Sequence, residues 1–282
     1  MPEQPGLAAL RVDLHAHSTR SDGTLAPAAL FERAAGTGVG LFALTDHDAL
    51  PAIDQPTCVD AMQILSGIEL TTLWQGRVIH VLGLRFEPDE AGPLARGVAA
   101  QHEARLQRAA RIAARLQKRG IEGALEGAMI FAGDGAVGRP HFARWLVQAG
   151  HARDLEAAFR LFLSDKLIGT AATVWAPLED AVRWIVGQGG TAVLAHPAKY
   201  RFTHTRLRDL VADFKSAGGA ALEVISGPQV PATTRQLADV CRRFELAASA
   251  GSDFHGGPED RARLGHTSFL PDDLVPVWRD WC

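Results

Sequence analysis

Short apolar segments that alternate with helix-like stretches run through the sequence and indicate its fold class. Seven segments of strand length occur, at residues 10–14, 40–45, 63–68, 78–84, 191–195, 220–225 and 246–250. Helical periodicity is found between some of them, at residues 27–36, 178–188 and 207–217. Apolar strands that alternate with helices predict a parallel sheet covered on both faces. We therefore expect an α/β fold, either a βα barrel or a doubly wound sheet.

A long interval between the fourth and fifth of these strands lacks convincing strand signals. Residues 99–174 contain helical stretches, such as AAQHEARLQRAARIAARLQKRG and RPHFARWLVQAG, separated by glycine and aspartate. This pattern predicts a small helical insertion domain. The expected organisation is a first barrel segment at residues 1–98, the insertion domain at 99–174 and a second barrel segment at 175–282.

The composition fits a globular protein and gives no sign of a membrane span. The chain has 282 residues, of which 47% are hydrophobic and 22% charged, which suits one large domain or a domain with an insertion. A formal net charge of −3 gives no overall attraction to nucleic acid or to an anionic membrane. No apolar run has membrane-spanning length, and residues 1–10 lack a signal-peptide pattern.

Cysteine usage predicts a reducing compartment. Cys58, Cys241 and Cys282 are the three cysteines, and their wide spacing forms neither a CxxC metal site nor an even set for disulfides. We therefore expect a cytoplasmic protein with no membrane association and no obligate protein partner.

Histidines and carboxylates gather in or just after the predicted strands. Strand residues alternate between two faces, so His15 and His17 in the run DLHAHS point to the same side. Other candidates occur in the same kind of position along the chain: Asp22, His47, Glu69, His80, His196, Asp253 and His255. Loops at one rim of a barrel build its active site, which favours the barrel over the doubly wound sheet.

These nine side chains predict a metal centre that holds more than one ion. They are too many for a single ion, but they suit three divalent ions if Glu69 bridges two of them. Imidazole and carboxylate ligands without thiolate fit manganese, iron or zinc rather than calcium. Asp13, Asp46 and Asp48 are candidates for orienting the histidines, or else for capping and turn formation.

Five short runs resemble the PHP (polymerase and histidinol phosphatase) family. They are DLHAHSTRSDG at 13–23, LTDHD at 44–48, GIE at 67–69, AHP at 195–197 and GSDFH at 251–255. The resemblance implies a distorted seven-stranded βα barrel with a trinuclear metal site at its C-terminal rim. It further implies one ion on His15, His17, Glu69 and Asp253, a second on Glu69, His80 and His196, and a third on Asp22, His47 and His255.

The insertion narrows the resemblance to one branch of that family. The runs GRPH at 138–141 and AFRLFL at 158–163 look like the branch of nucleoside 3′,5′-bisphosphate phosphatases and related 5′–3′ RNA exonucleases. The segments around 164–166 and 174–176 depart from its pattern. The implied activity is hydrolysis of the 3′-phosphate of a nucleoside 3′,5′-bisphosphate by a metal-activated hydroxide.

Candidate roles follow from this activity. Glu69, Asp253 and His196 are the expected catalytic residues because they hold the ions that act on the phosphate. Arg139 and His141 are expected to bind the second phosphate, since a guanidinium fork and a helix N-terminus both suit it. Lys199, like the nearby Arg201, is a weaker candidate for substrate binding.

Three alternatives remain open from the sequence. The first is a 5′–3′ exonuclease on short RNA that uses the same metals. The second is hydrolysis of histidinol phosphate. The third is a non-catalytic binding module that the metals only stabilise, although the complete candidate ligand set speaks against it.

Overall fold

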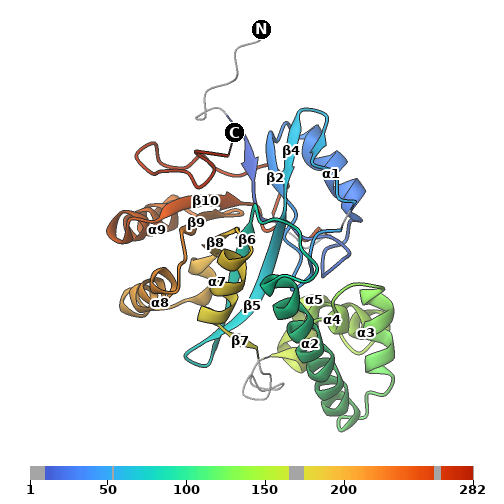
Figure 1. Ribbon diagram of the computed structural model, residues 1–282. Helices are drawn as coiled ribbons and strands as arrows, with labels where there is room; N and C mark the ends of the chain where they lie inside the picture. The colour runs from blue at the N-terminus through green and yellow to red at the C-terminus, as the bar shows by residue number, and fades with distance from the viewer. Residues whose placement is uncertain (1–9, 53, 165–174, 257–261, 282) are drawn as a thin grey trace.

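The computed structural model describes residues 10–52, 54–164, 175–256 and 262–281, and its strands form two sheets (Figure 1). The four-stranded sheet has the order β1-β2-β4-β3, and the six-stranded sheet has the order β10-β9-β8-β6-β5-β7. The strands are β1 (Val12–Asp13), β2 (Leu41–Ala43), β3 (Cys58–Val59), β4 (Met62–Leu65), β5 (Gly67–Trp74), β6 (Arg77–Leu84), β7 (Ala176–Pro177), β8 (Thr191–Leu194), β9 (Ala221–Ser226) and β10 (Ala247–Gly251).

Each predicted apolar segment overlaps an observed strand, and the predicted parallel pairing is present, but the sheet is not parallel throughout. Strand β6 runs antiparallel to both of its neighbours, β5 and β8. Gln75 and Gly76 explain the reversal, since both have positive φ values, 45° and 72°, and form a two-residue hairpin turn. Such a turn leaves no room for the crossover helix that parallel neighbours require. The fold is therefore mixed α/β with parallel and antiparallel pairs.

The two sheets are connected by backbone hydrogen bonds at the ends of their strands. The amide of Leu14, just after β1, donates to the carbonyl of Ala250 in β10 at 3.1 Å. Isolated parallel bridges join Ala16 to Phe254 and His47 to Glu69. These links bring the carboxyl ends of β1, β2 and β10 close to Glu69 in the first half of β5.

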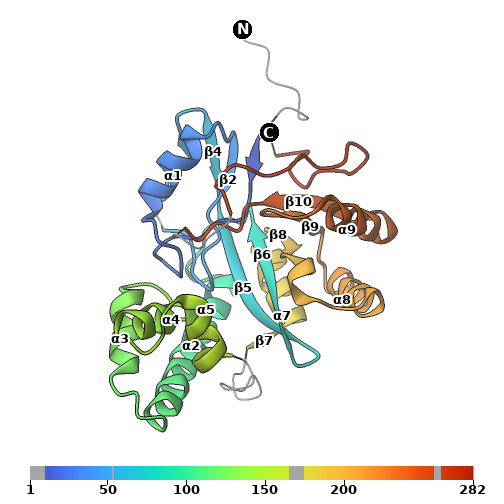
Figure 2. The ribbon, with the colours of Figure 1, turned by 180° about the vertical axis from the view of Figure 1, so that it is seen from behind.

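The helices fall into two groups around the strands (Figures 1 and 2). Helices α7 (Leu178–Gly187), α8 (His204–Ser216) and α9 (Pro231–Phe244) cover the six-stranded sheet, and α1 (Pro27–Gly36) lies beside the four-stranded one. Helix α7 packs so closely on β6 that a Cβ at Gly83 would lie 2.9 Å from Ile185. The core between these layers is formed by buried aliphatic side chains such as Leu70, Leu82 and Val193.

The interval between β6 and β7 is helical as predicted, over its described residues. It contains α2 (Pro93–Gln117), α3 (Ala124–Ala132), α4 (Arg139–Gln148), α5 (Leu155–Ala158) and the π-helix η2 (Phe159–Leu163). These helices have a separate apolar cluster that includes Ile112, Phe142 and Leu146. Residues 165–174 of the predicted insertion lie outside the described residues, and the three-segment division of the chain stays a prediction.

A buried polar contact attaches this helical segment to the strands. Arg105 of α2 donates from Nε to Asp48 Oδ2 at 2.8 Å, and the Thr71 amide of β5 donates to Asp48 Oδ1 at 2.8 Å. Gln101 accepts a hydrogen bond from the Ala176 amide at 3.1 Å, so α2 contacts the chain on both sides of the interval.

The described helices and cysteines bear on the expected location of the protein in the cell. Among the described helices, none has the length and apolar character that a membrane crossing requires. Cys58 is exposed and Cys241 is buried, and neither forms a disulfide, while Cys282 lies outside the described residues. The cytoplasmic location stays a prediction.

Candidate metal centre

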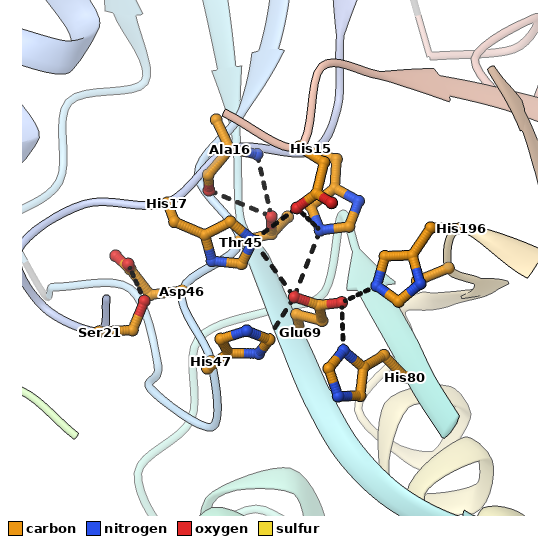
Figure 3. A network of polar contacts seen from close by, with 12 residues as sticks. His15, Ala16, His17, Ser21, Thr45, Asp46, His47, Glu69, His80 and His196 are labelled. Atoms are coloured by element: carbon orange, nitrogen blue, oxygen red, sulfur yellow. Dashed lines mark hydrogen bonds and ion pairs between the residues drawn. The ribbon is translucent and has the colours of Figure 1, made fainter. Parts of the chain in front are cut away.

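The predicted histidines and carboxylates converge at one place, around the side chain of Glu69 on β5 (Figure 3). Glu69 is fully buried, and histidine rings from other segments point toward its carboxylate. Its Oε2 lies 3.3 Å from His15 Nε2, 3.2 Å from His17 Nε2 and 3.1 Å from His47 Nδ1, and its Oε1 lies 2.9 Å from both His80 Nδ1 and His196 Nε2.

Two further carboxylates complete the cluster on its other sides. Asp22 Oδ1 lies 3.3 Å from His255 Nε2, and Asp22 Oδ2 lies 3.8 Å from His47 Nε2. Asp253 Oδ1 lies 3.3 Å from His17 Nε2 and 3.4 Å from His15 Nε2. All nine predicted side chains therefore lie in one cluster.

Within this cluster, four groups of ligand atoms are close enough together to hold an ion. They are His17, Asp22, His47 and His255; His15, His17 and Asp253; His15, Glu69 and His196; and His47, Glu69 and His80. The groups overlap at shared residues, which is the arrangement that neighbouring ions with common ligands require.

The hydrogen bonding of these atoms supports a fit to metal ions. Among the described residues, several buried ring nitrogens of the cluster lack a hydrogen-bond partner: His15 Nε2, His17 Nδ1 and Nε2, His47 Nδ1 and His196 Nδ1. Glu69 Oε2 is in the same state. Burying polar atoms without a hydrogen-bond partner costs free energy. Imidazole nitrogens and carboxylate oxygens that face a common point form the set of ligand atoms that a transition metal binds.

The electrostatics of the cluster also favour a cation. Burial alone would raise the pKa of Glu69, but the surrounding imidazoles, led by His47 and His15, hold it well below its usual value. Burial would lower the pKa of His17, yet Asp253 and Glu69 raise it to about 10. This negative field attracts divalent ions, and their binding must displace protons from the imidazoles.

The backbone at two cluster residues adopts a rarely occupied conformation. His196 and Asp253 have φ values of 31° and 53°, in the left-handed region that non-glycine residues usually avoid. Gly251 lies beside them, and a Cβ there would be 2.3 Å from His15 Cβ. Strain and close approach of this kind are common where a site must hold side chains in place.

Sequence reasoning missed one important residue, Glu223 in β9. Its side chain is fully buried, and its Oε1 lies 2.9 Å from His15 Nδ1. Its Oε2 accepts a hydrogen bond of 2.6 Å from the backbone amide of His196. Glu223 therefore fixes the ring of one cluster histidine and the backbone of another. The only signal was a carboxylate within the apolar run ALEVIS.

The three aspartates proposed to orient histidines accept hydrogen bonds mainly from loop and helix groups, although Asp13 also accepts one from the His15 backbone amide at 3.5 Å. Asp46 accepts hydrogen bonds from Ser18 and Ser21 side chains, both at 2.6 Å, and so holds the loop that leads to Asp22. Asp48 binds α2, as described above. Asp13 accepts from the backbone amides of Ser252 and Gly265, both at 2.8 Å. Their observed role is to position loops.

A pocket of about 160 Å³ lies between the cluster and the helical segment, and we call it the insertion pocket. Its lining includes the cluster residues Asp22, His47 and His80, together with Arg108 of α2 and Arg139 of α4. Its remaining described lining includes Thr71, Arg105, Phe159 and Trp175. The guanidinium of Arg108 lies over the Trp175 ring, 5.6 Å from its centroid, which restricts its position.

Of the three predicted substrate contacts, only Arg139 lines this pocket. His141 is buried beneath it, where its Nδ1 accepts a 2.9 Å hydrogen bond from the Gly138 amide and caps α4. Burial lowers the pKa of His141 to about 4, so the ring is neutral at pH 7. Lys199 donates to Asp253 at the opposite edge of the cluster. Substrate binding by His141 and Lys199 stays a prediction.

Comparison with known proteins gives a consistent result, although no family model matches the chain. The chain is 40% identical over 273 residues to a 3′,5′-nucleoside bisphosphate phosphatase from Chromobacterium violaceum, with 95% of each chain covered. It is 42% identical over 276 residues to the 5′–3′ exoribonuclease Rnm of Escherichia coli, with 95% of this chain and 93% of the relative covered.

Two solved structures are similar to the chain in fold. A structure from Chromobacterium violaceum, described as an amidohydrolase with bound sulfate, superposes with a TM-score of 0.87 at 40% identity and 95% coverage of both chains. A structure from Bifidobacterium adolescentis, described as a metal-dependent phosphoesterase, has a TM-score of 0.76 at 25% identity, with 95% of this chain and 93% of that chain covered.

Proposed function

Because the chain belongs to the PHP family of metal-dependent phosphoesterases, we propose that it hydrolyses the 3′-phosphate of a nucleoside 3′,5′-bisphosphate. The chain is a phosphoric ester hydrolase, as its relatives are. The substrate is supported by one observation above all: the lining of the insertion pocket combines three cluster residues with arginines, among them Arg108 and Arg139.

This lining suits a substrate with two phosphates. One phosphate would lie against Asp22, His47 and His80, where the cluster begins, and the other against the guanidinium groups of Arg108 and Arg139. Guanidinium forks bind phosphate oxygens with paired, charge-assisted hydrogen bonds. The nucleoside between the two phosphates would then lie along the pocket, beside Phe159 and Trp175.

The proposed cofactor is a set of three divalent ions, of manganese, iron or zinc. The nine clustered side chains would hold them, with Glu69 shared between two ions because its two oxygens face different histidines. When bound, such ions supply a hydroxide nucleophile at neutral pH and neutralise the phosphoryl oxygens.

The residues of this chain fix the position of the reacting phosphate. Glu69 would keep the histidines that contact its Oε1 at a constant distance from those that contact its Oε2. Asp253 and His196 would be held in place by their constrained backbones, which have positive φ values. Arg139 holds the phosphate that is not cleaved, so the 3′-phosphate meets the centre in one orientation.

We also propose that the strands form the distorted seven-stranded barrel of the family. The hydrogen bond from Leu14 to Ala250 and the bridge between His47 and Glu69 support this closure, because they connect the two sheets at both of their junctions. Helices α2 to η2 would then form an insertion domain above the carboxyl ends of the strands.

The test compares phosphate release from two substrates by the metal-loaded enzyme. Arg139→Ala should lower kcat/KM for a nucleoside 3′,5′-bisphosphate by roughly ten- to a hundredfold, the effect of losing a charge-assisted hydrogen bond. It should barely change kcat/KM for a nucleoside 3′-monophosphate, which has no second phosphate. Arg153→Ala, at an exposed arginine of the same helical segment, is the control.

Three outcomes would contradict this function. Equal losses on both substrates would mean that Arg139 does not select the second phosphate. Faster hydrolysis of histidinol phosphate than of any bisphosphate would favour that alternative, and metal binding without phosphate release from any of these substrates would favour a binding module.

A further inference from the structure

We propose that a second pocket, on the other side of the metal centre, binds the nucleotide that follows the scissile phosphate of a short RNA. This inference rests on the proposed function, because both use the same centre and the same insertion pocket. We call this second pocket the downstream pocket.

The downstream pocket has a volume of about 310 Å³ and lies where three segments meet. These are the 3₁₀ helix η4 (Pro197–Tyr200), the end of β9 and the start of α9. Its lining includes His196, Lys199, Arg201, Ser226, Gln229 and Val230.

Two contacts connect this pocket to the metal centre. His196 lines the pocket and also places its Nε2 2.9 Å from Glu69 Oε1. Lys199 lines the pocket and donates to the Asp253 carboxylate. The insertion pocket reaches the same centre through other side chains, among them His47. Figure 3 shows His47 and His196 on opposite sides of the Glu69 carboxylate, with His80, which also lines the insertion pocket, between them, so the two pockets reach the centre through different histidines.

The charge of the downstream pocket suits phosphodiester groups. Its described lining contains the cations Lys199 and Arg201 and no carboxylate. Helix α9 begins there, and its N-cap residue Val230 has no side-chain capping bond, so the positive end of the helix dipole faces the same region. By contrast, the large groove between the loop after β2 and helix α3 is lined by Asp54, Glu90 and Asp134 as well as by Arg20, so its lining suits phosphodiester groups less well.

The chemistry explains why one added pocket is enough to accept RNA. In a bisphosphate, a water oxygen bonds to phosphorus, the bond from phosphorus to the 3′-oxygen breaks, and that oxygen takes up a proton. In a 5′-phosphorylated RNA the same bond breaks at the first phosphodiester. The products are a 5′-mononucleotide and a shortened RNA that again begins with a 5′-phosphate.

The two substrates therefore differ only in one group on the reacting phosphorus: the next nucleotide, which the RNA has and the bisphosphate lacks. A bisphosphate fills the centre and the insertion pocket and leaves the downstream pocket without a ligand. An RNA carries its next nucleotide on the reacting phosphate, on the side of the centre away from the insertion pocket. The basic lining beside Lys199 and Arg201 is placed to receive it.

The experiment compares a 5′-phosphorylated trinucleotide RNA with a nucleoside 3′,5′-bisphosphate at equal metal loading. Arg201→Ala should lower kcat/KM for the trinucleotide by about tenfold and for the bisphosphate by less than about twofold, since only RNA has a phosphate near Arg201. Arg208→Ala, at an exposed arginine of α8 outside the pocket, should leave both values unchanged.

Two substitutions at Val230, to glutamate and to lysine, separate the effect of the charge of the side chain from the effect of its size. Val230 lines the pocket and is 65% exposed, so both a lysine and a glutamate fit there. Val230→Glu should lower the rate on the trinucleotide by about tenfold, whereas Val230→Lys should maintain or raise it, and neither should affect the bisphosphate. Equal effects of the two variants would overturn the pocket's electrostatic role.

The wild-type enzyme distinguishes failure of this inference from failure of the proposed function. Hydrolysis of the bisphosphate without cleavage of the trinucleotide would overturn the downstream pocket and leave the proposed function intact. Hydrolysis of neither substrate would overturn both. Cleavage of the trinucleotide that is unchanged in Arg201→Ala and Val230→Glu would also overturn the assignment to this pocket.

Discussion

At the scale of single residues, the site depends on buried carboxylates that position histidines from distant segments. Glu69 meets imidazoles from four such segments, and these contacts could be predicted because each histidine occurs in or just after a predicted strand. Glu223 could not be predicted this way. It lies within an apolar strand, and only the fold brings it to His15.

Glu223 gives a direct prediction about metal affinity. Its carboxylate accepts from the backbone of His196 and contacts the ring of His15, and a glutamine keeps the shape but only one acceptor oxygen. Glu223→Gln should therefore weaken metal binding roughly 10- to 100-fold, the usual effect of losing a partner of a metal-bound histidine. Competition with a chelator measures it directly.

The Glu223 experiment has a clear control and a second readout. Glu179→Gln, at an exposed position on α7, should leave metal binding unchanged. Activity of Glu223→Gln should recover at a higher metal concentration if the residue acts through the ions. Unaltered affinity in the chelator competition would show that Glu223 only fills space.

At the scale of elements, polar residues within strands limited what the sequence could predict. The predicted segment at 63–68 covers most of β4 and the first two residues of β5, and it stops there because Glu69, Thr71 and Thr72 break the apolar pattern. All three are nevertheless buried, since this part of β5 borders the metal centre and α2. The two-residue strands β3 and β7 are too short to leave any periodic signal.

The cap of α4 predicts a dependence of stability on pH. The pKa of His141 is about 4 in the folded chain, chiefly because burial disfavours the charged ring, whereas an unfolded histidine has a pKa of about 6.5. Between these values the unfolded chain takes up a proton that the folded chain resists. The stability from neutral His141 is therefore present above pH 6.5 and is lost as the pH falls toward 4.

The variant His141→Gln isolates this contribution. The difference in the free energy of unfolding between the wild type and this variant should fall by about 3 kcal/mol from pH 7 to pH 4. Urea denaturation across that range measures the difference. If the difference stays constant with pH, then His141 is not the neutral cap that its bond to Gly138 indicates.

At the scale of the whole molecule, the metal centre connects parts of the chain that are far apart in sequence. Its candidate ligands come from before and after the helical segment, from His15 to His255. Bound ions would therefore stabilise the folded chain against the unfolded one, in which those ligands are separated.

We expect chelation to lower the melting temperature by several degrees and to abolish phosphate release, and added manganese or zinc to restore both. Elemental analysis of the loaded enzyme should find more than one ion per chain, because four overlapping ligand groups cannot all serve a single ion. At most one ion, with an unchanged melting temperature after chelation, would contradict the multinuclear centre.

The parallel bridge between Ala16 and Phe254 has a consequence for the order of events during synthesis. A ribosome completes His15, His17 and Glu69 early, but it adds Asp253 and His255 only after the entire helical segment has been made. The nascent chain thus displays a partial set of ligands throughout translation. Full coordination becomes available only when the late segment pairs with the early one, so stable metal uptake should follow synthesis of the late segment rather than accompany synthesis of the early one.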